Sequence, residues 1–426
     1  MSGQKSGVKT QILKEENRAL YIHCFNHALN LGVNDTMKSI QLLKDTLSFS
    51  EEIIILIKKS RKRETMLKNL KLADSEAGPG VKTFCRTRWT VKGASLDSLI
   101  TNYKALLKLF KISYREETKT DMKSRINGCR SKMLQFEFFL GICLARDILN
   151  LTDRLAEKLQ RKDLCVSEAK ELYKMTAEIL EGMKSNEFDK FWENTVQKSQ
   201  DLNIEMPQMK RNRKRPARLI EIDSSSDEEI HDLPTTPKEY FKKIFLQSID
   251  EVVKCLKERF EQDGLKIYEN LQQLLLLAVK GDNYDEKMDI ILDFYKDDFN
   301  SNSLKTEMKI FKTMFPKKDD LKFGDLISFF KENARKVRYC IPEVCKVMEL
   351  ILVLPASNAS PERSFSKLRS IKTHLRSTMS AERLNHFMIL GHYTKMVDNL
   401  DSEKIATEFI SRYEVPEKTF GKVSLE

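Results

Sequence analysis

Residues 354–380 have the sequence LPASNASPERSFSKLRSIKTHLRSTMS, which combines several helix signals in a short stretch. Ser360, Pro361 and Glu362 are an N-cap residue, a first-position proline and a first-turn acid. Apolar residues then recur along one helical face: Phe365, Leu368, Ile371 and Leu375. The stretch therefore predicts an amphipathic helix that begins beside Ser360.

Two further helices are predicted on either side of this stretch. Pro342 is well placed for the first turn of a helix that runs to Leu354, where Pro355 ends it. Another helix starts near Ser380 and carries apolar residues at positions i, i+3 and i+4. Such rich apolar faces on so short a segment indicate an interface. The predicted dimerisation residues are Leu350, Leu354, Phe365, Leu368, Leu384, Phe387 and Met388, with Val347 and Ile351 on the first of these helices.

The composition favours a soluble, mainly helical protein. The 426 residues are 41% hydrophobic and 32% charged, which excludes global disorder, and only 14 are Gly, so close turns are few. The longest apolar runs have five or six residues, whereas a membrane span needs about 20. Eight widely spaced Cys are not a disulfide framework and predict reduced thiols in the cytosol or nucleus.

The net charge of +11 points to polyanionic partners such as nucleic acid. Between Pro207 and Pro237, a basic block at 210–218 precedes an acidic, serine-containing block at 221–229, as is typical of a disordered linker. Its exposed cations predict nuclear import and salt-sensitive DNA binding, which phosphorylation of the nearby serines would mask. The residues assigned to this role are Lys210, Arg211, Arg213, Lys214 and Arg215.

Elsewhere the pattern predicts helices with one exception. Residues 19–24 (ALYIHC) have the character of a short buried strand. The run 51–72 is ambiguous at its start, and we interpret it as a helix. Helical periodicity covers 95–199, and it resumes at Thr236 and continues to about residue 330.

Two short motifs each allow two interpretations. Cys24 and His27 are spaced as two metal ligands, but a structural zinc site needs four, so we interpret them as packing or hydrogen-bonding residues and expect no metal. Arg88 and Trp89 either stack on a base and contact phosphate or anchor the next helix to the core. Cys340 and Cys345 lie in an apolar helix and are expected to be core thiols.

Glu362 also has two interpretations. It is a first-turn acid favoured by the helix dipole, or it is a carboxylate ligand of a metal ion in phosphoryl transfer. The second role requires at least two more carboxylates, usually Asp residues at strand ends.

Taken in order, CFNHALNL (24–31), TRW (87–89) and the stretch 354–380 resemble the hAT superfamily of DNA transposases and its domesticated descendants. The likeness is greatest to animal hAT-derived proteins of the zinc-finger MYM-type and THAP-linked kind. The stretch 354–380 resembles the start of the family's C-terminal dimerisation region. The resemblance covers about residues 1–100 and 235–420.

The resemblance implies a predominantly α fold in which an incomplete RNase H-like α/β core is interrupted by a large helical insertion domain. It implies the following regions: a partial RNase H-like core at 1–94, a helical insertion at 95–206, a charged linker at 207–237, the continued insertion at 238–335, and a C-terminal RNase H-like helix with the α-helical dimerisation region at 336–426.

The family's catalytic set is Asp, Asp and Glu around divalent metal, and Glu362 takes the Glu position. The second Asp lies shortly before the CxxH motif, yet residues 1–34 contain no Asp, and Asp35 follows that motif. We therefore expect a truncated product that lacks both Asp residues, the family's N-terminal zinc finger and transposase activity.

The resulting prediction is a non-enzymatic, nuclear hAT-derived protein that dimerises with itself or with a related hAT-derived protein. DNA is a further expected partner, with no membrane, cofactor or metal. One alternative is an active transposase of the Asp-Asp-Glu type, if the chain is a fragment of a longer protein. The other is a helical scaffold with no nucleic-acid role.

Overall fold

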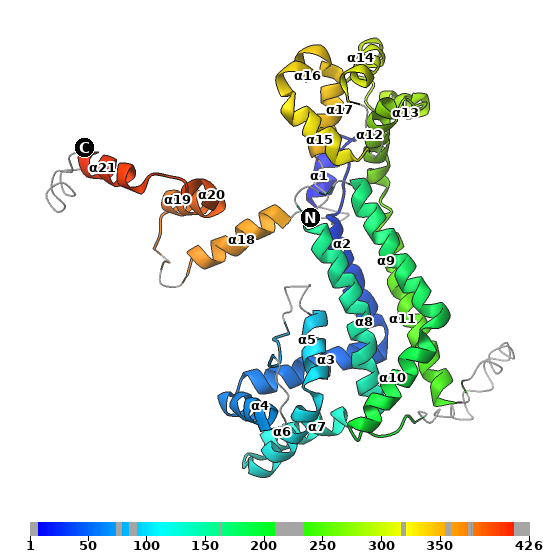
Figure 1. Cartoon of the computed structure of the whole chain (residues 1–426), viewed down its shortest axis with the longest axis vertical. Coiled ribbons are helices and arrows are strands. Elements are labelled where there is room, and N and C mark those ends of the chain that lie inside the picture. Colours follow the sequence, from blue (N-terminus) through cyan, green and yellow to red (C-terminus); the bar gives the residue numbers. More distant parts are fainter. Residues whose placement is uncertain are drawn as a thin grey trace. The chain divides into compact units, whose positions relative to one another are not determined.

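The computed structural model describes residues 7–73, 79–84, 92–161, 164, 166–208, 234, 236–316, 321–353, 359–373, 376 and 378–412. These residues form helices and the segments that join them, and they include no β-strand. The chain divides into two compact units, Met1–Ser357 (unit 1) and Asn358–Glu426 (unit 2). Figure 1 labels the helices of both. The predominantly α class is thus confirmed, whereas the RNase H-like sheet stays a prediction.

The strand predicted at residues 19–24 is wrong. This segment is irregular. Its backbone polar groups form hydrogen bonds with a side chain, whereas those of a strand would bond to a neighbouring strand. The amide N–H of His23 donates to Gln262 Oε1 at 2.8 Å, and Gln262 Nε2 donates back to the His23 carbonyl at 3.3 Å. Residues 19–24 are half-buried, and Ile22 packs against the first core, so the predicted burial is met only in part.

Unit 1 begins with α1 (Val8–Glu15), which buries no side chain, and then builds a first hydrophobic core. The helices of this core are α2 (Phe25–Ser39), α3 (Gln41–Lys58), α4 (Arg61–Ala73), α5 (Lys92–Thr101), α6 (Tyr103–Glu116), α7 (Thr120–Met133), α8 (Phe136–Leu159), α9 (Val166–Asn186), α10 (Phe188–Asp201) and α11 (Pro237–Phe260). The predicted helix 51–72 is therefore two helices, α3 and α4, with a break after Lys58.

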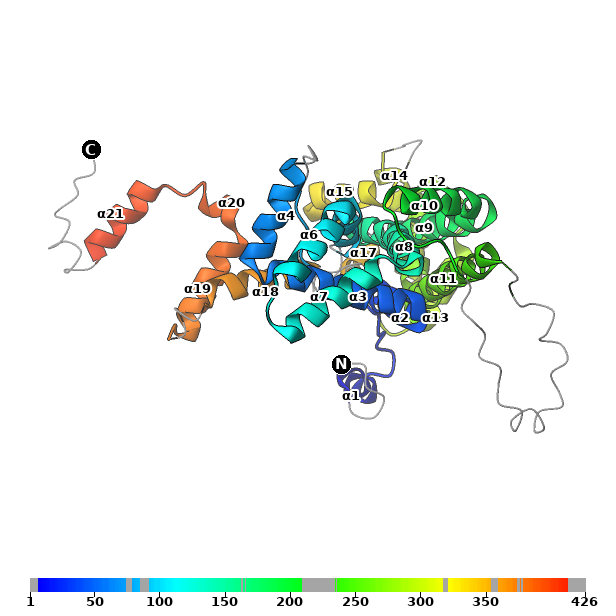
Figure 2. The same ribbon diagram turned by 90° about the horizontal axis from the view of Figure 1, so that it is seen from below.

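Helix α8 is the centre of the first core. Its residues 138–145 are all buried, as expected for a helix surrounded by others. It contacts α2, α3, α5, α7, α9 and α10. Figure 2 shows α2, α8, α9 and α11 side by side, in agreement with their contacts.

Helix α12 (Asp263–Lys280) joins the first core to a second one, because Leu265 packs in the first and Leu271 in the second. The other helices of the second core are α13 (Asp285–Phe294), α14 (Ser301–Met314), α15 (Phe323–Glu332), α16 (Ala334–Cys340) and α17 (Pro342–Val353). Residues 336–353, assigned from the sequence to the dimerisation region, thus pack within unit 1.

Several predicted helix starts are confirmed. Helix α11 begins at Pro237 after Thr236, whose side chain accepts from the Glu239 amide at 3.2 Å in a capping box. Helix α17 begins at Pro342 as expected and is described up to Val353, while the predicted end, Leu354, lies outside the described residues. Of the linker between Pro207 and Pro237, residues 209–233 lie outside the described residues.

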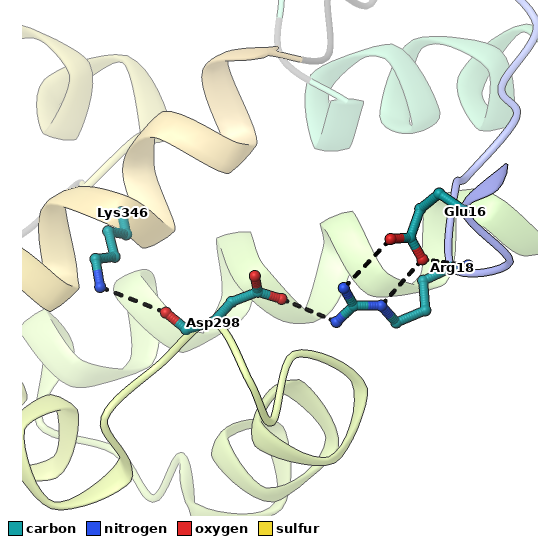
Figure 3. A network of polar contacts seen from close by, with 4 residues as sticks. All are labelled: Glu16, Arg18, Asp298 and Lys346. Atoms are coloured by element: carbon teal, nitrogen blue, oxygen red, sulfur yellow. Dashed lines mark hydrogen bonds and ion pairs between the residues drawn. The ribbon is translucent and has the colours of Figure 1, made fainter. Parts of the chain in front are cut away.

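A polar network ties the segment after α1 to the second core (Figure 3). Arg18 Nη1 pairs with Asp298 Oδ2 at 3.0 Å, and Arg18 Nε pairs with Glu16 Oε1 at 3.2 Å. Lys346 Nζ, on α17, donates to the Asp298 carbonyl at 3.4 Å. Exposed pairs of this kind contribute only about 0–1 kcal/mol, so the network positions the segment more than it stabilises it.

The cysteines follow the prediction only in part. The six described ones, Cys24, Cys129, Cys143, Cys255, Cys340 and Cys345, are all free thiols. Cys345 is a buried core thiol, and burial raises its pKa to about 11. Cys340 is exposed, contrary to expectation, since it is the last residue of α16 and does not share the helix of Cys345, which lies in α17. Within the described ranges, every helix is too short or too polar to cross a bilayer.

Candidate dimerisation surface

The first of the three helices predicted to form an interface, α17, is already covered within unit 1. Val347 is fully buried and Ile351 is 4% exposed, while Leu350 is half-buried against the second core. Helices α12, α14 and α16 provide this cover. Leu354 lies outside the described residues. The apolar face of α17 that carries Val347 and Ile351 therefore packs in the second core, and a role of Leu350 and Leu354 in dimerisation stays a prediction.

Two carboxylates fix α17 to α14 by capping each other's helix. Glu307 Oε2, from α14, accepts from the amides of Glu343 and Val344 at 2.7 and 3.1 Å, at the start of α17. In return, Glu343 Oε2 accepts from the amide of Asn300, the N-cap residue of α14, at 3.1 Å. Burial raises the pKa of the Glu307 carboxyl above its ordinary value, against the opposing effect of the two amide donors. This reciprocal capping fixes the position of α17 relative to α14.

Unit 2 contains the other two predicted helices, α18 (Ala359–Ile371) and α19 (Ala381–His392), followed by α20 (Thr394–Val397) and α21 (Ser402–Arg412). The predicted start of α19 is confirmed, since the Ser380 side chain accepts from the Arg383 amide at 3.3 Å. Helices α18 and α19 contact each other. Gly391 lies at this contact, where an added Cβ would be 3.7 Å from Ile371 Cδ1, an ordinary van der Waals distance.

Polar contacts support the pairing of α18 with α19. Lys367 Nζ donates to the Gly391 carbonyl, and Ser364 Oγ lies 3.4 Å from His392 Nδ1. The predicted interface residues Leu368, Leu384, Phe387 and Met388 are all half-buried. Arg383 additionally lies over the Phe387 ring, 5.9 Å from its centroid. The two helices thus cover part of each other's apolar faces.

The remaining apolar surface of unit 2 faces solvent. Phe365 is 69% exposed and Ile389 is 56% exposed. No described residue of α19, α20 or α21 is buried. Exposed apolar side chains that were not among the predicted interface residues are Ile389, Leu390, Tyr393, Met396, Leu400, Ile405 and Phe409. The i, i+4 spacing of Ile405 and Phe409 was a usable signal for α21.

Cys24 and His27 lie at the start of α2 and are not part of this surface. Cys24 is half-buried at the N-cap position, and His27 is exposed with its ring stacked on that of His23, 6.2 Å between centroids. Burial lowers the pKa of His23, and the charges of His27 and Arg259 add to this effect. Within the described part of the chain, no group of three or more His, Cys, Asp or Glu side chains could hold a metal ion.

The structure does not describe the side chains of the other predicted site residues. Arg88 and Trp89 lie outside the described residues, as do Lys210, Arg211, Arg213, Lys214 and Arg215. Glu362 is in the first turn of α18, and the structure does not describe its side chain.

Comparison with known proteins identifies a family region that includes this surface. Residues 304–393 match the family model described as the hAT family C-terminal dimerisation region. The match begins in α14 and ends just after α19, so it includes α17 with its capping carboxylates as well as the exposed pair α18 and α19. The presence of such a region towards the C-terminus is confirmed, although the match begins at residue 304, before the expected start at 336.

Two relatives are similar to nearly the whole chain. Both are described as "52 kDa repressor of the inhibitor of the protein kinase". The Mus musculus protein is 20% identical over 421 residues and the Homo sapiens protein 21% over 418 residues, each covering 94% of this chain. The chain spans about half the length of these relatives, 53% and 52%. No solved structure matches it significantly.

Proposed function

We propose that this chain is a hAT-derived protein that acts by forming dimers through unit 2. The observation that supports the proposal is the contrast within the matched region, where α17 is buried but α18 and α19 leave large apolar side chains exposed. Apolar surface of this kind is removed from water at a stable interface, at roughly 25 cal/mol per Å² of area buried. A second copy of unit 2 supplies a complementary apolar surface through twofold symmetry.

We further propose that the dimer is nuclear, associates with DNA and has no transposase activity. The support for the nuclear and DNA-associated role is the basic block at 210–218, and the lack of activity is proposed for this chain taken alone, in which Glu362 is the matched position of the family's catalytic Glu. Both relatives are named as repressors, and a regulatory role is proposed for this chain on the same grounds. An RNase H-like origin of the fold, and a kinship with zinc-finger MYM-type and THAP-linked proteins, remain part of this proposal.

The test is the mass of the purified chain by light scattering at micromolar concentration. We expect a mass near twice the 49.7 kDa of one chain. The double variant Phe365→Glu with Ile389→Glu should give a mass near that of one chain. Dimerisation would bury the two new carboxylates without partners, and this opposes association. Salt should change the wild-type mass little.

A matched control is available on α9. Ile179 is 52% exposed, close to the value for Ile389, but it lies in unit 1. Ile179→Glu should therefore remain dimeric. A wild-type mass near 49.7 kDa, or equal dissociation by the control variant, would contradict the proposal.

A further inference from the structure

The positive charge of the protein is concentrated in one part of unit 1. Residues 58–132, from the end of α3 to the end of α7, contain 20 Lys and Arg but only 7 Asp and Glu, a net charge of +13. The whole chain carries +11, so the remaining residues carry −2. Helices α4, α6 and α7 lie together at one end of unit 1 (Figure 1). The charge that suggested a polyanionic partner is therefore mainly in a folded region and not in the linker.

Helix α6 arranges part of this charge as a regular row. Lys104, Lys108, Lys111 and Arg115 occur at i, i+4, i+7 and i+11, which places them on one face of a helix. We refer to these four residues as the basic stripe. Three of them are exposed and Lys108 is half-buried. At 1.5 Å per residue the stripe is about 16 Å long. Residues 98–115 contain no acid.

The opposite face of α6 is fixed in the first core. Leu106, Leu109 and Phe110 are fully buried, and the Tyr103 hydroxyl donates to the Met133 carbonyl of α7 at 2.7 Å. Helix α4 packs on another side, where Met66 Sδ accepts from Ser113 Oγ at 3.9 Å. Because its apolar face is already occupied, α6 does not insert into a membrane or a peptide-binding groove as free basic amphipathic helices do.

The nearest acids in the sequence are paired with other residues. Lys62 Nζ lies 3.0 Å from Glu116 Oε2, and Arg63 Nη1 lies 3.8 Å from Glu117 Oε2, both from α4. Within the part of the chain that the structure describes, Lys104, Lys111 and Arg115 form no ion pair. Their charge is thus compensated mainly by solvent ions, which a polyanion would release on binding.

We infer that the basic stripe binds the phosphate backbone of double-stranded DNA. The inference deepens the proposed DNA association and rests on it, but it assigns the contact to α6 instead of the linker. Each strand of a duplex carries one phosphate per about 3.4 Å of axis, so a stripe about 16 Å long can contact several phosphates of the backbone. Lysine-rich contacts to phosphate fix position without selecting a base sequence. The binding is therefore independent of sequence and strongly dependent on salt.

The experiment compares two triple variants of the full chain by fluorescence anisotropy with a short mixed-sequence duplex. Lys104→Gln, Lys108→Gln and Lys111→Gln together remove three cations of the stripe. The control removes Lys305, Lys309 and Lys312, which have the same i, i+4, i+7 spacing on α14 and are all exposed, but lie outside the basic region. Circular dichroism melting confirms that both variants fold.

We expect the α6 variant to bind at least about tenfold more weakly and to lower the slope of log K against log salt by about 3, while the α14 variant changes little. Equal binding by wild type and the α6 variant, or equal losses for both variants, would overturn the inference. So would a loss confined to a variant with Arg211, Arg213, Lys214 and Arg215 replaced by Ala. Anionic vesicles serve as a further probe, and a dependence on the stripe seen with vesicles but not with DNA would also reject it. Light scattering on the same samples tests the dimer separately.

Discussion

Helix α17 and the pair α18 and α19 have similar apolar stripes and lie within the same matched region, yet they end in opposite environments. Ile351, on α17, is 4% exposed, whereas Ile389, on α19, is 56% exposed. The difference is one of neighbours: α17 lies among α12, α14 and α16, while α18 and α19 mainly cover each other. An amphipathic pattern therefore indicates that one face of a helix is buried against other residues. The tertiary structure determines whether those residues belong to the same chain.

The largest expected difference in the free energy of unfolding is between truncation of an isoleucine in α17 and truncation of an isoleucine in α19. Ile351→Ala should lower the free energy of unfolding by about 2–5 kcal/mol, because it leaves a cavity in the second core. Ile389→Ala should change it by less than about 0.5 kcal/mol when measured in dilute solution, where unit 2 is not in an interface. Chemical denaturation followed by circular dichroism measures both. Equal losses would show that the two helices are equally packed and would break the comparison.

A smaller difference in stability is expected between loss of the buried cap of α17 and loss of the exposed cap of α19. Glu307→Ala removes a carboxylate of α14 from the start of α17 and leaves the amides of Glu343 and Val344 unpaired inside the protein. The expected loss of stability is about 1–3 kcal/mol. Ser380→Ala removes only the local cap of the exposed helix α19, at about 0.5–1 kcal/mol. If the two losses were equal, α17 would be held no more firmly than α19.

The smallest effect concerns the dependence of unit 1 on pH. Burial raises the pKa of the Asp153 carboxyl from 3.8 to about 7, although the Gly93 amide at the start of α5 donates to it at 3.2 Å. The folded state therefore holds this proton when the unfolded state has released it. The stabilisation is complete below about pH 4 and is lost as pH rises through about 7.

Asp153→Asn tests this effect, because the amide keeps an oxygen acceptor for Gly93 but does not titrate. Thermal unfolding should show the wild type losing about 1 kcal/mol between about pH 5 and pH 8, a figure reduced for solvent screening at a half-buried group. The variant should show a flatter profile. Parallel profiles for wild type and variant would exclude Asp153 as the source.

The candidate site was predictable where its signals are local. Pro342 and Ser380 each marked a helix start that the structure confirms, because capping depends on a few adjacent residues. The exposed apolar residues of α20 and α21 were not predicted, although the spacing of Ile405 and Phe409 was a local signal for α21. The basic stripe was missed for another reason: its residues are separated by apolar ones, so it forms no charged run like 210–218.

By itself, the sequence determined that the protein is mainly helical, where many of its helices begin, and that its C-terminal part carries apolar faces in excess. These properties follow from side-chain spacing and backbone geometry over one or two turns. Only the tertiary structure decided that residues 19–24 bond to Gln262 instead of forming a strand, that α17 is core, and that Phe365 remains exposed. The physical reason is that burial and hydrogen-bond partners depend on residues hundreds of positions apart, which no local pattern specifies.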